Sequence, residues 1–362
     1  MTHTESAGFE LEGRPIGPGH PPYIIAELSA NHNGSLEQAL AIIDAIAETG
    51  ADAVKLQTYT ADTMTLDSDR PDFQLTEGPW AGRSLYELYE WAHTPWEWHE
   101  ALFQRGRERG LTVFSSPFDA TAVDFLEDFE PAAYKIASFE LVDLPLIEYA
   151  ASKGRPLIMS TGMATRTEVM EAVATARRAG CEEICLLHCT SGYPTPSEEA
   201  DLRTLPVLGE RYGVVPGLSD HTLETAVPVA ATALGACVIE KHVTMRRADG
   251  GPVAAFSLEP EELRDLVQQT RTAWQALGCV REGPRESEVT QRPLRRSLYV
   301  AKDMKAGEVF TPEHVKSVRP GYGLEPRWYR AIIGQHAAQN LQAGKALKTA
   351  DIHFQSKAPI KN

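Results

Sequence analysis

Eight short apolar segments alternate with eight helix-like segments between residues 23 and 278. Continuous apolar strands between amphipathic helices are typical of a parallel sheet that is covered by helices on its outer face. The strand segments are YIIAELSAN, AVKLQTY, LTVFSSPF, AYKIASFE, PLIMSTGM, EICLLHCT, VVPGLSDHT and CVIEKHVT, and nearly all of them end in polar side chains. This α/β pattern predicts a closed (β/α)8 barrel whose functional residues lie on the rim formed by the carboxyl ends of the strands.

The length of the chain predicts a second, smaller domain, because 362 residues exceed the roughly 250 of one such barrel. The stretch VREGPRESEVTQRPLRR is charged and contains proline, and it interrupts the apolar periodicity, which is typical of a linker. We therefore predict an N-terminal extension over 1–22 that could form a hairpin under the barrel. The barrel would occupy 23–280, the linker 281–294 and a compact β-rich domain 295–362.

The formal net charge of −15 argues against nucleic acid and anionic membranes as partners. The N-terminus lacks a signal-peptide pattern, and no apolar stretch approaches the ~18 residues of a membrane span. We expect a cytoplasmic protein, with its five cysteines reduced. A small anionic substrate would need cations that converge locally, and the candidates are Lys55, Lys135, Lys241 and Arg319.

The connection over 60–95 is much longer than most strand-to-helix loops. It contains the aromatic residues Trp80, Tyr86, Tyr89 and Trp91. Long loops on the catalytic rim of a barrel are usually functional, so the segment is a candidate lid over a substrate or against a neighbouring subunit. A helix at SLYELYEWA that packs its aromatic side chains on the barrel is the other interpretation, and the sequence leaves both open.

Several strand ends carry side chains that can share one cavity. Alternation along a strand puts Lys55 and Gln57 on one face, and likewise Glu240 and His242. Lys135 has the opposite parity to Ser138 and Glu140, so these three converge only if that strand bends or ends before Ser138. With Lys55 and Lys135, the strand-end hydroxyls predict an anion site. These hydroxyls belong to Ser116, Ser138, Ser160, Ser191 and Ser219.

His221 and His242 end the seventh and eighth strand segments, which are neighbours in a closed barrel. A single histidine at a strand end is usually only hydrogen-bonded, but two on adjacent ends predict a site for a divalent metal ion, and imidazole with nearby carboxylate suits Mn²⁺, Co²⁺, Fe²⁺ or Zn²⁺. Glu27 and Glu140 are candidates for binding sugar hydroxyls or moving protons. Tyr193 begins the loop after the sixth strand and either forms a substrate platform or belongs to an ordinary turn.

The ordered motifs AELSANHNG, AVKLQTY, FSSPFD, YKIASFE, STGM, HCTSGYPTP, GLSDHT, EKHVT, RRSLYVAKDMKAGE and VRPGYG resemble the sialic acid synthase family over almost the whole chain. Within that family, LQTYTADTMTLDSD, TPWEWHEALF and FSSPFDATAVDFLE are most similar to pseudaminic acid synthases. The resemblance implies a TIM barrel followed by an antifreeze-like (SAF) domain of the β-clip type.

The resemblance also implies an activity. Phosphoenolpyruvate would condense with an amino-sugar aldehyde, giving a nine-carbon 2-keto acid and phosphate, in a metal-dependent, partner-swapped homodimer. His221 and His242 would hold the metal, Mn²⁺, Mg²⁺ or Co²⁺, and Arg319 of the SAF domain would reach the other subunit's active site. The implied phosphoenolpyruvate contacts are Lys55, Ser116, Lys135, Ser138, Ser160, Ser191 and Ser219. We group Glu27, Gln57, Glu140, Tyr193, Asp220 and Glu240 as catalytic residues around the sugar, the intermediate and the metal.

Two positions depart from the family pattern. Ser191 stands where N-acetylneuraminate synthases have asparagine, and Val253 stands where the family usually has an aspartate that contacts the sugar. A substrate hydroxyl left unpaired beside Val253 would cost roughly 1–3 kcal/mol if buried. The acceptor is therefore open between precursors of pseudaminate, N-acetylneuraminate and legionaminate. A metal-dependent hydrolase or isomerase and a non-catalytic sugar-binding protein are alternatives of other classes.

Overall fold

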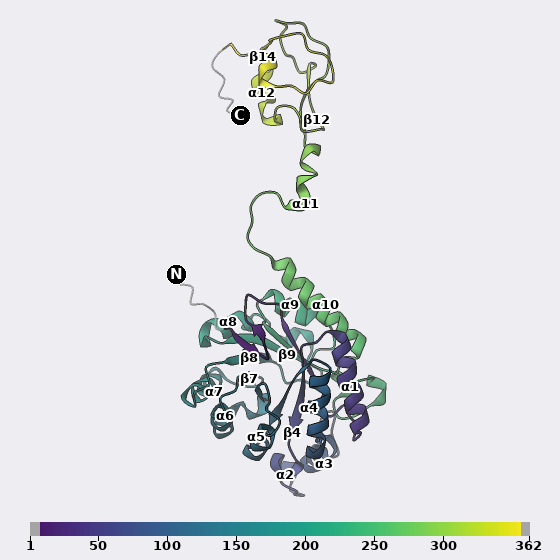
Figure 1. The fold of residues 1–362 in the computed structure, drawn as a ribbon, viewed down its shortest axis with the longest axis vertical. Helices are drawn as coiled ribbons and strands as arrows, with labels where there is room; N and C mark the ends of the chain where they lie inside the picture. Colours follow the sequence, from purple (N-terminus) through teal and green to yellow (C-terminus); the bar gives the residue numbers. More distant parts are fainter. Residues whose placement is uncertain (1–7, 356–362) are drawn as a thin grey trace. The chain divides into compact units, whose positions relative to one another are not determined.

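The computed structural model describes residues 8–355, in two compact units that divide between Gly278 and Cys279. The first unit is a closed barrel of parallel strands in the order β10-β3-β4-β5-β6-β7-β8-β9, which confirms the predicted fold class (Figure 1). The barrel strands are β3 Tyr23–Glu27, β4 Ala53–Thr58, β5 Thr112–Pro117, β6 Tyr134–Ile136, β7 Leu157–Ser160, β8 Ile184–Cys189, β9 Val215–Asp220 and β10 Val238–His242.

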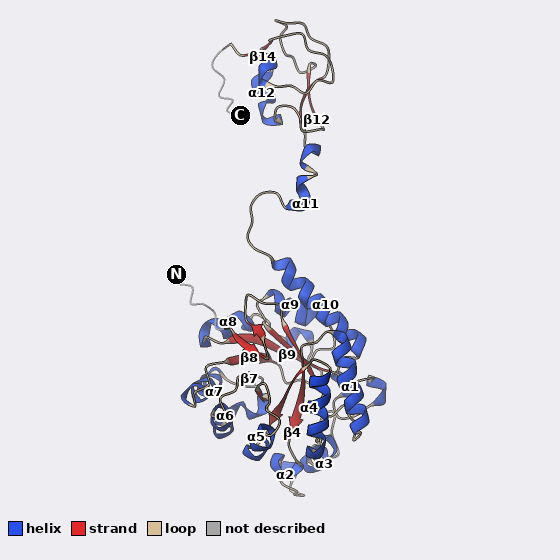
Figure 2. Ribbon diagram, in the orientation of Figure 1, coloured by secondary structure: helices blue, strands red, loops and turns tan. Residues whose placement is uncertain are grey.

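Helices surround these strands (Figure 2). They are α1 Leu36–Thr49, α4 His99–Glu108, α5 Ala120–Glu127, α6 Leu144–Ala151, α7 Arg166–Arg178, α8 Thr204–Tyr212, α9 Ala226–Ala233 and α10 Pro260–Leu277. The segment between β4 and α4 adds two further helices, α2 Ala61–Met64 and α3 Leu85–Ala92. Nearly every barrel-strand residue is buried, because helices cover the outer face and side chains fill the inside. That double burial explains why the strands are continuous apolar runs.

The ends of α1 are set by local features of its sequence. The Ser35 side chain accepts a hydrogen bond from the Gln38 amide and caps the first turn. Gly50 ends the helix at φ 83°, in the left-handed region that glycine adopts without steric cost. The buried positions of α1 recur at helical spacing and face the sheet. The chain leaves α1 at Gly50 and enters β4 at Ala53.

The amino ends of the barrel strands pack against a short antiparallel hairpin, β1 Phe9–Leu11 and β2 Arg14–Ile16. Phe9, Leu11 and Ile16 belong to the same buried cluster as inward-facing side chains of the barrel, among them Tyr23 and Phe114. The lower barrel interior is therefore an apolar core. A second, larger core lies between the strands and the helices.

The second unit has its own hydrophobic core, which includes Leu298, Phe310 and Leu347. Its elements are α11 Glu286–Val289, β11 Ser297–Val300, β12 Val315–Val318, α12 Tyr329–Ile332, β13 His336–Ala337 and β14 Ile352–His353. β11 pairs with β12, and β13 pairs with β14, both antiparallel. The unit is thus a small, β-containing domain.

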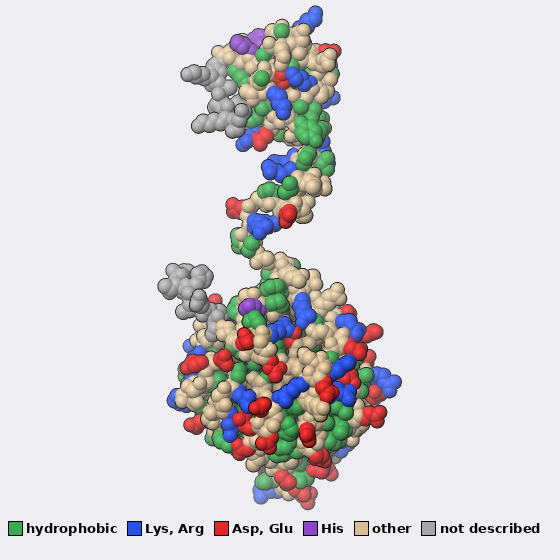
Figure 3. Space-filling view, in the orientation of Figure 1, with side chains coloured by type: hydrophobic (Ala, Val, Ile, Leu, Met, Phe, Trp, Pro, Cys, Tyr) green, Lys and Arg blue, Asp and Glu red, His purple; other side chains and the backbone are tan. Residues whose placement is uncertain are grey.

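Acidic and basic side chains are interspersed over the visible face of the barrel unit (Figure 3). That face carries no broad field of one sign, despite the net charge of −15. In the described part of the chain, no helix is both long enough and apolar enough to cross a membrane.

Candidate functional site

Two lysines and two glutamates meet inside the barrel, at the carboxyl ends of its strands. Lys55 of β4 forms an ion pair with Glu27 of the neighbouring β3, and its Nζ lies 3.7 Å from Glu240 Oε1. Lys135 of β6 lies 4.0 Å from the same Glu240 oxygen. All four side chains are at most 6% exposed. Charges this deeply buried are costly unless they are paired or bind a ligand, so the cluster marks a functional cavity.

Burial and the neighbouring lysine charges together shift the pKa values of Glu27 and Glu240 in opposite directions. Burial alone would raise the pKa of Glu240, but the ammonium groups of Lys135 and Lys55 outweigh burial and lower it. Burial raises the pKa of Glu27, against the opposing effect of the Lys55 ammonium. Burial also lowers the pKa of Lys135. Glu240 is thus held as a carboxylate, while Glu27 is the acidic group of the pair that more readily keeps a proton.

Three of the predicted serines bind this cluster directly. The Lys55 ammonium donates to Ser116 Oγ at 3.3 Å, and the Lys135 ammonium donates to Ser160 Oγ at 2.7 Å. Ser219 Oγ donates to Glu240 Oε1 at 3.1 Å. The hydroxyls therefore orient the charged groups from three different strands. The same hydroxyls can instead form hydrogen bonds with the oxygens of an anionic ligand.

Ser138 and Ser191 meet at Gly162, which the sequence analysis did not select. The Gly162 amide donates to Ser138 Oγ at 3.1 Å, and a Cβ at Gly162 would overlap the hydroxyl oxygens of both serines. Strand β6 ends at Ile136 and a 3-10 helix, η3 Ser138–Val142, follows at once. This early end removes the parity conflict with Lys135. The three residues form a small cradle of hydroxyl and amide groups, which suits phosphate oxygens.

Glu140 lies in the same 3-10 helix. Its Oε2 atom is buried and has no hydrogen-bond partner among the described residues. Burial raises the pKa of Glu140 to about 7, and the charge of Lys135 only partly opposes this. Such a carboxyl group can hold or release a proton near neutral pH.

His221 and His242 lie side by side, with ring centroids 5.4 Å apart. His221 Nδ1 lies 3.1 Å from the Thr190 carbonyl oxygen, which fixes this nitrogen as the donor and leaves Nε2 as the ring atom available to a ligand. His242 Nδ1 is buried and has no hydrogen-bond partner in the described part of the chain. Burial lowers the pKa of His242, so its ring is neutral, as a metal ligand requires.

These two rings fit the requirements of a divalent metal ion. Across residues 8–355, no group of three His, Cys, Asp or Glu side chains is arranged to hold a metal. Two protein nitrogens would therefore leave most coordination positions to substrate and water. Open positions of this kind are a property of catalytic rather than structural metal sites.

Aromatic side chains form a wall beside the histidines. The Tyr193 ring lies 4.7 Å from the His221 ring and 5.0 Å from that of Phe256, and Phe256 lies 5.1 Å from His242. Phe256 belongs to a 3-10 helix, η6 Ala254–Phe256, that begins directly after Val253. Phe256 was missed by the sequence analysis, because only its position in space connects it with His242.

The aromatic residues of the 60–95 segment lie in two different environments, one beside the aromatic wall and one away from it. Trp80 Nε1 donates to the Pro252 carbonyl at 2.8 Å, and the Trp80 ring lies 6.0 Å from Tyr193. Tyr89 of α3 packs edge-on against Tyr59. In contrast, the Tyr86 hydroxyl binds Asp62, and Trp91 is 41% exposed under Arg83. One part of the segment therefore covers the aromatic wall, and another part does not.

The remaining candidates lie apart from the cluster or only near it. Gln57 follows Lys55 on the same strand face and is paired in register with Ser116. Asp220 is not brought into the cavity, because its carboxylate binds Lys241 at 2.5 Å and the amide and hydroxyl of Thr222. Lys241 is consequently occupied as well. Arg319 follows β12 in the second unit.

Together, the barrel and this rim define a class: a TIM-barrel protein with a buried lysine–glutamate cluster beside two histidines. Comparison with known proteins is more specific. The NeuB family profile matches residues 42–282, and the SAF domain profile matches 295–353. The chain belongs to the NeuB family and carries a C-terminal SAF domain.

Characterised relatives extend over nearly the whole chain. A pseudaminic acid synthase of Campylobacter jejuni is 44% identical, over 91% of this chain and 96% of its own length. The pseudaminic acid synthase of Helicobacter pylori is 45% identical, over 92% and 98%. Among solved structures, an N-acetylneuraminic acid synthetase from Leptospira borgpetersenii superposes with a TM-score of 0.71 at 31% identity, over 80% of this chain and 96% of its own.

Proposed function

We propose that this protein is a pseudaminic acid synthase. It condenses phosphoenolpyruvate with an amino-sugar aldehyde and releases a nine-carbon 2-keto acid and inorganic phosphate. The observation that carries the proposal is the convergence of Lys55, Lys135, Glu27 and Glu240 with the His221–His242 pair at one rim. The identity of 44–45% to pseudaminic acid synthases supports this choice of product.

The cluster fits phosphoenolpyruvate as a ligand. Lys55 and Lys135 supply two positive charges in a water-poor cavity, where they attract the carboxylate and the phosphate strongly. The cradle of Ser138, Ser191 and Gly162 supplies directed donors for phosphate oxygens. A hydrolase or isomerase would give neither the lysine pair nor this cradle a task, so phosphoenolpyruvate chemistry is the better fit.

The proposed reaction forms one C–C bond and breaks one C–O bond. Carbon 3 of phosphoenolpyruvate attacks the aldehyde carbon, and the electron pair of its double bond becomes the new C–C bond. Water adds to carbon 2 and loses a proton, and the aldehyde oxygen gains one. The C–O bond between the resulting tetrahedral carbon and phosphate then breaks, the phosphate leaves with the bonding electron pair and takes up the proton of the carbon 2 hydroxyl, and the 2-keto group remains. We assign proton movement near carbon 2 to Glu27, whose pKa burial raises, and charge stabilisation there to Glu240.

We further propose that His221 and His242 hold a divalent ion, Mn²⁺, Mg²⁺ or Co²⁺. When bound, such an ion supplies Lewis-acid polarisation of the acceptor's aldehyde oxygen. The Thr190 carbonyl orients the His221 ring for this role. Tyr193 and Phe256 exclude water beside the histidines and present flat apolar surfaces to the acceptor.

The test measures phosphate release from phosphoenolpyruvate with Mn²⁺ or Mg²⁺ against three acceptors: the diacetamido-trideoxy-altrose of pseudaminate synthesis, the legionaminate precursor and N-acetylmannosamine. Turnover with the altrose derivative, and a product mass equal to a condensed nine-carbon acid, is the expected result. Turnover only with another acceptor would reassign the substrate. Sugar binding without phosphate release from any acceptor would refute the synthase proposal and favour a non-catalytic sugar-binding protein.

We also propose a homodimer in which Arg319 of one subunit completes the active site of the other. Mixing two inactive variants tests this directly. A heterodimer of Arg319→Ala and His242→Ala subunits contains one site with both residues intact, so mixing should restore a substantial fraction of turnover. If Arg319 served its own barrel, each site in the mixture would lack one residue and no activity would return.

A further inference from the structure

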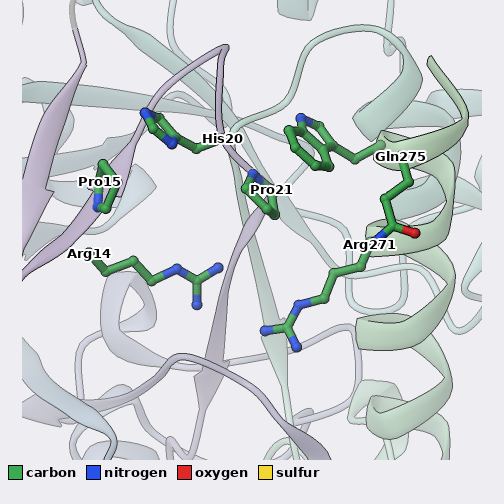
Figure 4. A pocket seen from close by; sticks show the side chains of 7 residues that line it. Arg14, Pro15, His20, Pro21, Arg271 and Gln275 are labelled. Atoms are coloured by element: carbon green, nitrogen blue, oxygen red, sulfur yellow. The ribbon is translucent and has the colours of Figure 1, made fainter. Parts of the chain in front are cut away.

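A second cavity lies at the opposite end of the barrel from the lysine–carboxylate cluster. It measures about 310 Å³ and is lined by residues of the N-terminal hairpin region and of α10 (Figure 4). It lies at the amino ends of β3 and β4, because Arg14 and Arg271 both bind Asp52, which directly precedes β4. Neither the proposed reaction nor the proposed dimer uses it.

The cavity has an excess of positive charge. Arg14 and Arg271 extend toward one another from the hairpin and from α10 (Figure 4). Among the described residues, Asp52 is the one carboxylate that forms an ion pair with either arginine, and Asp52 Oδ2 also accepts a hydrogen bond from the Ile24 amide at 2.7 Å. One carboxylate cannot neutralise two guanidinium groups. The pair therefore keeps one uncompensated positive charge in a chain whose net charge is −15.

The two guanidinium groups are partly withdrawn from water, with 31% and 36% of their side chains exposed. Burial lowers the pKa of Arg14, and the nearby charge of Arg271 lowers it further. Each arginine is also fixed in place: Arg14 donates to the Pro22 carbonyl at 3.2 Å, and Arg271 donates to the Gly50 carbonyl at 2.8 Å. Pre-positioned, partly desolvated arginines bind oxyanions with little loss of entropy.

Most of the remaining lining consists of ring side chains. Trp274 of α10 contributes a half-buried indole, Pro15, Pro21 and His20 add further rings, and Gln275 adds a polar amide. An indole face stacks well on a planar ring. The volume of about 310 Å³ lies at the lower end of the range for small-molecule sites.

We propose that this cavity, the floor site, binds a small organic anion in which a phosphate or carboxylate is attached to a planar ring. The anionic group lies against Arg14 and Arg271, and the ring lies against Trp274. Both phosphates and carboxylates satisfy this chemistry, and the probes below distinguish them. The site is separate from the rim, so it binds its ligand while the rim is empty or occupied.

Binding to the full-length protein is measured by calorimetry and by the part of the tryptophan fluorescence change that is lost in Trp274→Leu. The probes are uridine 5′-monophosphate, benzoate, inorganic phosphate and uridine, each up to about 10 mM. Uridine monophosphate or benzoate should bind at least tenfold more tightly than phosphate or uridine, because only the first two combine anion and ring. No binding of either ring-bearing anion, or equal binding of uncharged uridine, would overturn the floor site.

Variants locate the binding and separate it from the rim. Arg271→Gln and Trp274→Leu should each weaken binding at least ~10-fold, whereas Lys55→Met, which disables the rim, should leave it unchanged. Arg264→Gln is the matched control, because Arg264 lies on the same helix but lines a neighbouring hollow instead. Equal loss in Arg264→Gln would show a general charge effect, and loss in Lys55→Met alone would place the ligand at the rim. Either outcome refutes the proposal.

Discussion

Two buried ionic groups lie on opposite faces of the same barrel strands, β9 and β10. On the inner face, Glu240 lies among Lys55, Lys135 and Ser219. On the outer face, Lys241 binds Asp220 at 2.5 Å and also donates to the Thr222 carbonyl. Both groups are almost fully buried. Burial alone therefore does not distinguish a functional charge from a structural one.

The difference lies in how completely each group is satisfied. The outer carboxylate of Asp220 has partners on both oxygens, from Thr222 and Lys241. On the inner face, by contrast, Glu240 Oε2, Glu140 Oε2 and His242 Nδ1 lack hydrogen-bond partners among the residues described. A fully paired network stabilises the fold, whereas unpaired buried atoms carry a cost that a ligand can repay. Substitutions on the two faces should consequently affect different measurements.

The largest effect on function is expected from His242→Ala. This change removes one of the two imidazoles proposed to hold the metal, so metal-dependent phosphate release should fall below detection. The barrel should remain folded, because the His242 ring contributes an unpaired nitrogen rather than a hydrogen bond. Turnover is measured with saturating Mn²⁺, and folding by the denaturant midpoint. Wild-type activity in the folded variant would remove the metal assignment.

Lys241→Met tests the outer face and should reverse this pattern. Removing the ammonium leaves the Asp220 carboxylate buried without its counter-ion, which typically costs about 3–5 kcal/mol of folding free energy. Chemical denaturation measures the loss. The double variant Lys241→Met/Asp220→Asn should recover part of it, because the remaining buried charge is gone. Unchanged stability with lost turnover would mean that Lys241 belongs to the functional group after all.

Gly162→Ala should have an intermediate effect, confined to the anion cradle. The added Cβ would overlap the hydroxyl oxygens of Ser138 and Ser191, so both must move. We expect a ~10-fold rise in KM for phosphoenolpyruvate, or about 1.4 kcal/mol, with the acceptor KM unchanged. Gly192→Ala is a suitable control, because the contacts there are looser. Equal increases for both substrates would argue against a separate phosphate cradle.

The sequence predicted the barrel because its periodicity is local and repeated eight times. The predicted strand starts agree with the structure. Several predicted strands are too long at their carboxyl ends, because the rim residues there continue the sequence pattern but do not pair with a neighbouring strand. AYKIASFE illustrates this: only Tyr134–Ile136 is strand, and Ser138 already begins a 3-10 helix. The alternation along GLSDH also separates Ser219 from Asp220, which explains why Asp220 turns to the outer face.

Other parts of the site depend on contacts that no local pattern encodes. Phe256 meets His242 only because the loop after β10 folds back over the rim. Gly162 touches Ser138 and Ser191 from three different segments, and one sequence gives no signal for such a close approach. The Arg14–Asp52–Arg271 group joins residues more than 200 positions apart. Polar types at strand ends could be predicted, but their partners could not.

The effect expected at Glu140 is on the pH dependence of stability, and it shows that an inner-face carboxylate costs folding free energy. Burial raises its pKa to about 7, above an unfolded value of 4.5, so the folded state binds the proton more tightly. Its contribution to stability is therefore present below about pH 4.5 and is lost as the pH rises through about 7.

Glu140→Gln removes this dependence, because the amide does not ionise. Relative to the wild type, the variant should gain stability that grows from about 1 kcal/mol at about pH 5 to about 3 kcal/mol at about pH 8. Denaturation at a series of pH values, with the exposed Glu148→Gln as control, measures the difference. A gain that is equal at all pH values would show that packing, rather than the buried charge, sets the cost of this residue.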